Sequence, residues 1–171
     1  MKKALIVTTV LLGFLVIACS TPGKKQFTDA VSYDQFIIDR MEQMQQALFA
    51  VQRVTGSDSS GAQADIGSYI TRIDSVTKTL RELPDFNGDT GYRDAAVRLG
   101  EFYKRSINGP YTEIASIYKE EKDTAQANSR VDTIISRLQQ EETAADNDFI
   151  KQRNAFAAKN HIKIEPAIPA E

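Results

Sequence analysis

The sequence predicts an all-α protein, an antiparallel up-down four-helix bundle with a kinked third helix and a long fourth helix. In four successive segments, apolar residues recur three and four positions apart, which is the period of an amphipathic helix. Short stretches rich in glycine, proline, aspartate and asparagine separate these segments. The alternation of apolar and polar residues that is typical of strands is almost absent. Short connections between amphipathic helices favour antiparallel packing around one core.

The first helix is expected to begin at Ser32. Ser32 and Gln35 have the spacing of a capping box, and Val31 and Phe36 are placed as a hydrophobic staple. The apolar stripe that follows ends before Gly56, and it consists of Ile37, Met41, Met44, Leu48 and Val51. The second helix follows a turn after Gly56, and its stripe consists of Tyr69, Ile73, Val76, Leu80 and Leu83.

Pro84 is expected to end the second helix, and a polar turn with two glycines follows. The third helix should start near Asp89 or Thr90, with an inward face made of Tyr92, Ala96, Leu99, Phe102 and Tyr103. Pro110 lies within this helical pattern. Because proline lacks an N–H and clashes with the carbonyl four residues earlier, we expect a kink or a short break there. The apolar face then continues through Tyr111, Ile114, Ile117 and Tyr118.

The fourth helix is expected to run from about Thr124 to Asn160, which is about 55 Å at 1.5 Å per residue. Its stripe consists of Ala127, Val131, Ile134, Leu138, Ala145, Phe149 and Phe156. The helix is longer than its partners, so its C-terminal part should project or pack on another subunit. Residues 161–171 are predicted to be an extended, disordered tail, and residues 32–160 to form the single helical domain.

The first 18 residues have the composition of a secretory signal peptide. Lys2 and Lys3 precede an apolar run from Ala4 to Leu15, which is shorter than the roughly 20 apolar residues that span a bilayer. The run leads into VIAC, residues 16–19, and Cys19 is the only cysteine in the chain. This tetrapeptide resembles the lipobox of bacterial lipoproteins. An uncleaved anchor or an ordinary secreted protein is the alternative.

The resemblance implies cleavage between Ala18 and Cys19 and acylation of Cys19, which would tie the protein to a membrane. Two or more acyl chains hold a protein stably, whereas one chain holds it marginally. Residues 19–31 would then be the lipidated cysteine and a flexible tether. By the sorting pattern of enteric-type lipoproteins, Ser20 in place of aspartate implies the outer membrane of the cell envelope.

The residue types needed for catalysis are scarce. His161 is the only histidine, which excludes a di-iron carboxylate bundle, and no serine nucleophile motif or phosphate-binding glycine loop is present. Glu141, Glu142, Asp146 and Asp148 are expected to be a solvated helix face rather than a divalent-cation site. We therefore predict a protein that is not an enzyme, with no cofactor and no metal. A formal net charge of −2 without a basic block argues against nucleic-acid binding.

The C-terminal phrase FIKQRNAFAAKNHIKIE, residues 149–165, is similar to the ending of small helical bacterial surface lipoproteins. The matching residues are Gln152, Phe156, Ala157, Lys159, Ile162 and Ile164. These proteins combine a lipobox, a short tether and a four-helix domain, and they have no assigned activity. The resemblance therefore implies fold and location only.

Two functions remain open from the sequence. The first is a lipid-anchored, non-enzymatic envelope protein that binds another envelope protein or presents a surface. The second is a small-ligand carrier or periplasmic chaperone with an aromatic groove between helices. The groove would be lined by Tyr92, Phe102, Tyr103, Tyr111 and Tyr118. The sequence does not specify an oligomeric state.

Overall fold

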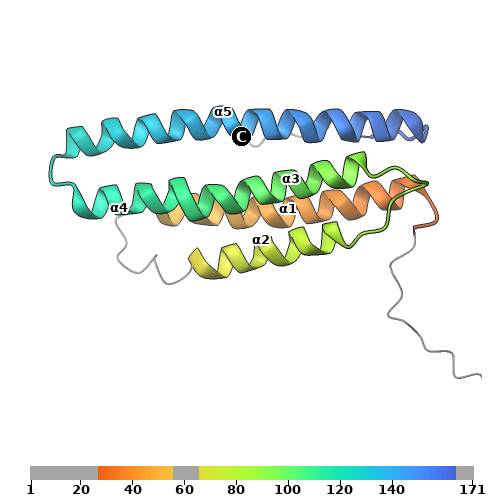
Figure 1. Cartoon of the computed structure of the whole chain (residues 1–171), viewed down its shortest axis with the longest axis horizontal. Helices are drawn as coiled ribbons and strands as arrows, with labels where there is room; N and C mark the ends of the chain where they lie inside the picture. The colour runs from red at the N-terminus through yellow and green to blue at the C-terminus, as the bar shows by residue number, and fades with distance from the viewer. Residues whose placement is uncertain (1–26, 56–65, 165–171) are drawn as a thin grey trace, which may run out of the picture.

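A computed structural model describes residues 27–55 and 66–164, and the regular elements among these residues are all helices, with no strand (Figure 1). The prediction of an all-α protein is confirmed. The helices are α1 (Ala30–Thr55), α2 (Ile66–Arg81), α3 (Gly91–Ser106), the π-helical turn η2 (Ile107–Tyr111), α4 (Thr112–Glu120) and α5 (Thr124–Lys159). The predicted signal peptide, Ala18 and Cys19 lie outside the described residues, as do residues 165–171 of the predicted tail.

Helix α1 begins two residues earlier than the sequence predicts, because Asp29 caps it instead of Ser32. Asp29 Oδ1 accepts the backbone N–H of Ser32 at 2.8 Å, and Asp29 Oδ2 accepts its hydroxyl at 2.8 Å. Val31 is 58% exposed, so the predicted staple with Phe36 is wrong. Phe27 takes that role, since its ring lies 5.2 Å from the rings of both Tyr33 and Phe36. The predicted tether, residues 19–31, therefore extends too far: Phe27 packs against the core, and Ala30 and Val31 belong to α1.

The predicted stripes form the core almost residue for residue. Every predicted stripe residue of α1 is buried, as are most of those of α2, α3 and α5. An aromatic cluster fills the end of the core where α1 begins and α5 ends, and its members are Phe27, Tyr33, Phe36, Phe86, Tyr92, Phe149 and Phe156. This end of the molecule is closed by tight aromatic packing.

The turn between α2 and α3 is a two-residue reversal. Phe86 and Asp89 exchange backbone hydrogen bonds of 3.3 and 3.0 Å, and Asn87 and Gly88 both have positive φ, 53° and 79°. Asn-Gly is the pair that such a type I′ turn favours, because both central positions need the left-handed region. The turn places the Phe86 ring against Tyr33.

The chain does not leave the helix at Pro110, so the predicted interruption takes the form of the π-helical turn η2. Thr112 Oγ1 donates to the carbonyl of Ile107 at 2.8 Å, which gives that carbonyl a partner. A π-helical turn contains one more residue than an α-helical turn, and this wider turn accommodates a proline without ending the helix. α3, η2 and α4 therefore continue as one helical run (Figure 1).

Helix α5 has the bounds that the sequence predicts to within one residue. Asp123 caps its start by accepting the N–H groups of Ala125 and Gln126 at 2.9 and 3.2 Å. At its end, His161 adopts a left-handed φ of 55°, and the N–H of Ile162 donates to the carbonyl of Ala157 at 3.1 Å. This is the hydrogen bond of a Schellman motif. Ile162 packs against the core, which corrects the prediction that the tail begins at residue 161.

The helices do not approach one another evenly. α3 packs closely on both α2 and α5, and α1 packs on α2 and on α3, whereas α1 and α5 lie farther apart. None of the helices in residues 27–55 and 66–164 is long and apolar enough to cross a membrane. The wider spacing between α1 and α5 is where the candidate site lies.

Candidate functional site

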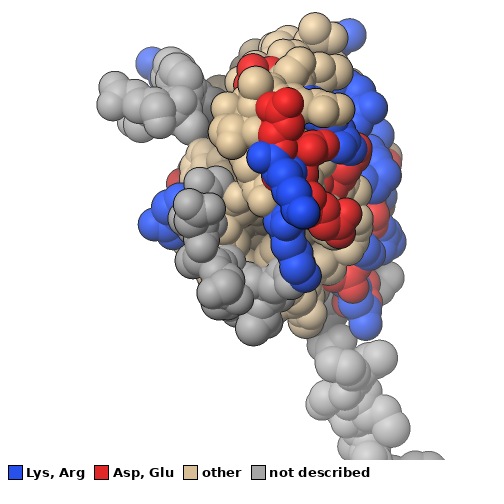
Figure 2. Space-filling view, turned by 90° about the vertical axis from the view of Figure 1, so that its left-hand side faces the viewer, with Lys and Arg blue, Asp and Glu red and all other residues tan. Residues whose placement is uncertain are grey.

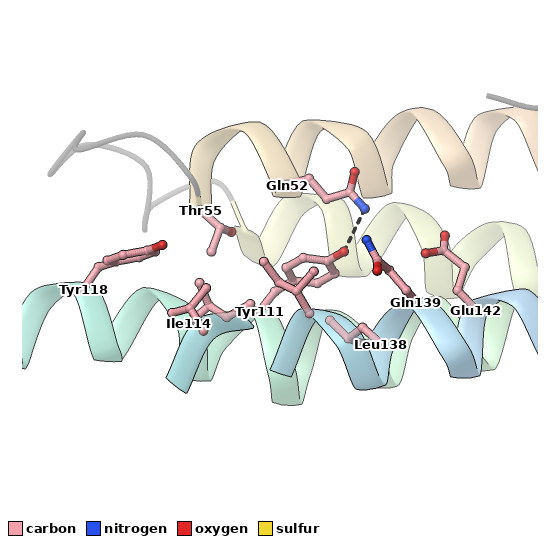
Figure 3. A pocket seen from close by; sticks show the side chains of 10 residues that line it. Gln52, Thr55, Tyr111, Ile114, Tyr118, Leu138, Gln139 and Glu142 are labelled. Carbon is pink, nitrogen blue, oxygen red and sulfur yellow. Dashed lines mark hydrogen bonds between the residues drawn. The ribbon is translucent and has the colours of Figure 1, made fainter. Parts of the chain in front are cut away.

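A cavity of about 340 Å³ opens between α1, the η2–α4 run and α5, near the α4–α5 turn (Figure 3). This volume is at the lower end of the range of about 300–1000 Å³ that is usual for small-molecule sites. The lining residues are Gln52, Thr55, Tyr111, Ile114, Tyr118, Val131, Ile135, Leu138, Gln139 and Glu142. We call this cavity the α1–α5 pocket.

One part of the pocket is apolar. Ile114, Val131 and Leu138 are buried residues that form its floor, whereas Tyr118 is 48% exposed and Ile135 is 38% exposed. Large apolar side chains that stay this exposed beside a cavity indicate a surface that can accept another apolar group.

The other part of the pocket is polar. Gln52 Nε2 donates to the hydroxyl oxygen of Tyr111 at 2.7 Å. Figure 3 shows this pair beside Gln139 and Glu142, which project from α5 toward α1, while Tyr118 lies at the opposite end. The pocket therefore has an apolar end and a polar, acidic end.

Tyr111 reaches the pocket from η2. It is the last residue of the π-helical turn and directly follows Pro110. Its ring is half-buried, and this burial raises the pKa of its hydroxyl, so that the group is neutral at pH 7. π turns are frequent at functional sites because they redirect a side chain that regular helix geometry would place elsewhere.

Glu142 and Asp146 lie one turn apart on α5 and are both half-buried. Burial raises the pKa of each carboxyl, and the charge of Asp146 raises that of Glu142 further. The hydroxyl of Tyr103 hydrogen-bonds to the Asp146 carboxyl, and this bond offsets part of the rise in the pKa of Asp146. Neither carboxyl forms an ion pair with a cation in the described part of the chain. The expectation of a solvated acidic face is therefore wrong for these two residues.

The groups that face the two carboxyls from the neighbouring helices are uncharged at pH 7. Helix α1 contributes Gln45, which hydrogen-bonds to Tyr103, and Gln52. Helix α3 contributes Tyr103, whose pKa is raised by burial and by the Asp146 charge, and η2 contributes Tyr111. None of these facing groups is a cation, and among the described residues the negative charge at this end of the pocket has no ion-pair partner.

Glu142→Gln is expected to raise the free energy of unfolding at pH 7 by about 0.5 kcal/mol, because it removes a repulsion between carboxylates one helical turn apart. A carboxyl group whose pKa is raised by folding stabilises the fold at low pH and loses that contribution as pH rises through its folded-state pKa. The advantage of the variant should therefore shrink as pH falls toward the ordinary pKa of glutamate. Urea unfolding at pH 7 and pH 4 measures both values.

Glu141→Gln is the matched control, because Glu141 is exposed on the same helix. It should change stability by less than about 0.5 kcal/mol at either pH. Equal curves for the two variants would contradict the partial burial of Glu142.

The structure divides the five predicted groove residues between two places. Tyr92, Phe102 and Tyr103 are buried in the core, with exposed fractions of 1, 6 and 1%. Tyr111 and Tyr118 line the α1–α5 pocket. A single aromatic groove made of all five is therefore wrong. The first three residues lie in α3, where Tyr92 and Tyr103 hydrogen-bond to Asp34 and Gln45 of α1. Tyr111 is the last residue of η2 and Tyr118 lies in α4, on the part of the helical run that borders the pocket.

A buried polar network between α1 and α5 was missed by sequence reasoning. Arg153 Nε and Nη2 donate to the two carboxylate oxygens of Asp34, both at 2.8 Å, and the hydroxyl of Tyr92 donates to Asp34 Oδ1 at 2.7 Å. The Asp34 carboxylate raises the pKa of Arg153. Both charged side chains are only about one-tenth exposed, at 10 and 11%. Such a bidentate pair fixes the relative positions of the two helices.

The sequence contains a pattern from which this network could have been predicted. Asp34 occupies a stripe position of α1, three residues before Ile37, and Arg153 lies between Phe149 and Phe156 on the stripe of α5. A charged residue in an apolar stripe indicates a buried partner on a facing helix. Asp34 also lies between Ser32 and Gln35, within the predicted capping box, where a polar residue is expected for local reasons.

The remaining candidates from the sequence, His161, Glu141 and Asp148, do not line the α1–α5 pocket. No group of three or more histidine, cysteine, aspartate or glutamate side chains that could hold a metal ion occurs in residues 27–55 and 66–164. His161 forms part of the Schellman motif that ends α5. Figure 2 views the end of the molecule that bears the α4–α5 turn, and basic and acidic side chains are mixed there without a basic block.

Comparisons of the chain with models of known protein families, with curated proteins and with solved structures found no match. The function is therefore inferred from the residues of this chain alone.

Proposed function

We propose that this chain is a lipid-anchored, non-enzymatic protein of the bacterial cell envelope whose helical domain is a protein-interaction or surface-presentation module. The observation that carries the proposal is the VIAC tetrapeptide, residues 16–19, which follows two lysines and an apolar run and contains the only cysteine. Acyl chains on Cys19 would insert into the membrane, and each buried methylene contributes about 0.8 kcal/mol. Because serine rather than aspartate follows Cys19, the sorting pattern of enteric-type lipoproteins supports the outer membrane as the location.

The scaffold we infer is an antiparallel up-down four-helix bundle. In it, α3, η2 and α4 together make the third helix, bent at the π-helical turn, and α5 makes the long fourth helix. The close packing of α1 on α2, of α2 on α3 and of α3 on α5 supports this arrangement, as does the layout of the helices in Figure 1.

The anchor would set the orientation of the domain. Phe27 packs at the aromatic end of the core, and the chain from Cys19 to Phe27 reaches at most about 29 Å. Helix α1 has 26 residues, which is a length of about 39 Å. The aromatic end would therefore face the membrane, and the α1–α5 pocket at the far end of α1 would point away from it.

The test is Cys19→Ser in the native host. The variant is expected to lose acylation and signal cleavage, so that metabolic labelling with palmitate fails and the membrane fraction holds no processed protein. Ser20→Asp is the companion variant, and it should keep the label but move the protein to the inner membrane. Normal labelling and membrane retention of the serine variant would refute the anchor.

A small-ligand carrier is the second candidate function, and the α1–α5 pocket favours it. A pocket with an apolar end and a few polar groups is typical of small-molecule sites. Photocrosslinking from position 118 in intact cells separates the two functions. An interaction module predicts crosslinks to one envelope protein, whereas a carrier predicts none to protein.

A further inference from the structure

No basic side chain in residues 27–55 and 66–164 forms an ion pair with the acidic end of the α1–α5 pocket. Glu142 lines the pocket and Asp146 lies one turn farther along α5, and both carboxyls are partly withdrawn from water. The facing side chains of α1, α3 and η2 are amides and phenols, which carry no positive charge at pH 7. Removing carboxylates from water without a cation costs free energy, and a cation that enters the pocket would offset that cost.

The rest of the pocket has the shape and surface for an apolar body. Leu138 and Ile114 form a buried floor next to the polar end, and Tyr118 and Ile135 continue the apolar surface to the exposed mouth. Figure 3 shows the order along the pocket, from Tyr118 through Tyr111 to Glu142. The rings of the two tyrosines also offer faces on which an organic cation can lie.

We propose that the α1–α5 pocket binds a small amphiphilic organic monocation, with its ammonium group at Glu142 and its apolar body between Tyr118 and Ile135. The proposal rests on the carrier function proposed above and names its ligand class. An ammonium group donates charge-assisted hydrogen bonds to the Glu142 carboxylate and to the Gln52 and Gln139 amide oxygens within the same pocket.

A metal cation fits the pocket less well than an organic one. Ca²⁺ takes six to eight oxygen ligands, and Mg²⁺ needs near-octahedral geometry. The described lining supplies one carboxylate, two amides, two phenols and one threonine hydroxyl, and its remaining four residues are aliphatic. An apolar wall adds nothing to the binding of a metal ion but contributes directly to the binding of an alkyl or aryl body.

The test uses the full chain and three probes of similar size and different charge: 2-phenylethylammonium, 2-phenylethanol and 3-phenylpropanoate. Binding is measured by ligand-observed NMR at pH 7. We expect the ammonium probe to bind at least about tenfold more tightly than the alcohol, because a hydrogen bond to a charged group contributes about 1.5–3 kcal/mol. The carboxylate probe should bind weakest.

Matched variants locate the site. Glu142→Gln should weaken binding of the ammonium probe about tenfold and leave the alcohol unchanged, whereas Glu141→Gln on the exposed face should have no effect. Tyr118→Ala should weaken both probes, and Phe49→Ala should weaken neither, because Phe49 is exposed outside the pocket. Asp146→Asn serves as a second charge-removing variant, and circular dichroism verifies that each variant is folded.

Equal binding of the ammonium and alcohol probes, or an unchanged affinity in Glu142→Gln, would overturn the proposal. Binding of CaCl₂ alone with loss of the ammonium probe would overturn it as well, in favour of a metal site. Each of these results leaves the lipid anchor intact, since that is measured separately by palmitate labelling of Cys19→Ser. Absence of binding by all three probes would reject both the ligand class and the carrier function.

Discussion

Arg153→Met is expected to lower the free energy of unfolding by about 3 kcal/mol. The substitution removes the guanidinium that donates two 2.8 Å hydrogen bonds to Asp34, and it leaves a carboxylate that is only 10% exposed with the hydroxyl of Tyr92 as its remaining partner in this network. Breaking a buried pair by removing one partner costs about 3–5 kcal/mol, and the small residual exposure of this pair favours the lower value. Urea unfolding followed by circular dichroism measures the change.

Arg98→Met is the matched control, because Arg98 makes the same kind of contact on the surface. Its Nη2 lies 2.6 Å from Asp148 Oδ2, but the two side chains are 56 and 40% exposed. An exposed pair contributes about 0–1 kcal/mol, so this variant should be at least about 2 kcal/mol more stable than Arg153→Met. Equal losses in the two variants would contradict the burial of the Asp34–Arg153 pair.

A double substitution separates the pair from its burial cost. In Asp34→Leu/Arg153→Met, both charges are gone and apolar groups occupy the site, so most of the lost stability should return. The difference between the double variant and the sum of the single variants gives the coupling energy of the pair. If the double variant loses as much stability as the two single variants combined, the coupling energy is zero. Asp34 and Arg153 would then act independently of each other, and the network assignment would fail.

The helices were largely predictable from the sequence because their apolar residues are spaced by three and four. Ile37, Leu80 and Val131 illustrate this, since each lies on a predicted stripe and each is at most 3% exposed. The fourth-helix start at Thr124 was also predictable from Asp123, which precedes it as a cap. Local pattern and local chemistry agree at these positions, and tertiary packing follows them.

The site was predictable only in part, because spacing along one helix does not give the distance between two helices. Tyr103 and Tyr111 look equivalent in the sequence, yet the first is buried against its neighbours and the second lines a pocket. The difference comes from the π-helical geometry of η2, which ends at Tyr111 and redirects its side chain, and from the wider gap between α1 and α5. The helical period of apolar residues in the sequence predicts neither the geometry of η2 nor the distance between α1 and α5.

The wider gap also explains where polar residues enter the interior. Facing positions of α1 and α5 carry Asp34 with Arg153, Gln45 near Asp146, and Gln52 beside Glu142. Long polar side chains span the space between α1 and α5, which aliphatic side chains would leave empty. These contacts between the two helices stop where the pocket begins. The same geometry thus produces an ion pair at the aromatic end and, at the pocket end, a carboxylate that has no ion-pair partner in the described part of the chain.

Gly100→Ala tests the opposite feature, the closest approach between helices, and is expected to lower the free energy of unfolding by about 2 kcal/mol. A Cβ at position 100 would lie 2.9 Å from the Met44 sulfur and would clash with the hydroxyl of Thr77. Met44 and Thr77 are almost fully buried, and Thr77 Oγ1 lies 3.5 Å from that sulfur, so neither side chain has free space to move into. Overpacking of this kind costs about 1–3 kcal/mol.

The sign of the effect separates packing from helix propensity. Alanine is a better helix former than glycine, so Gly67→Ala in α2, where nothing lies within 4 Å of the added Cβ, should raise stability by about 0.4–1 kcal/mol. Thr77→Ala should restore part of the stability lost in Gly100→Ala, because it removes the group that the new methyl meets. A gain in stability from Gly100→Ala alone, measured by urea unfolding, would mean that α1, α2 and α3 do not meet at this glycine.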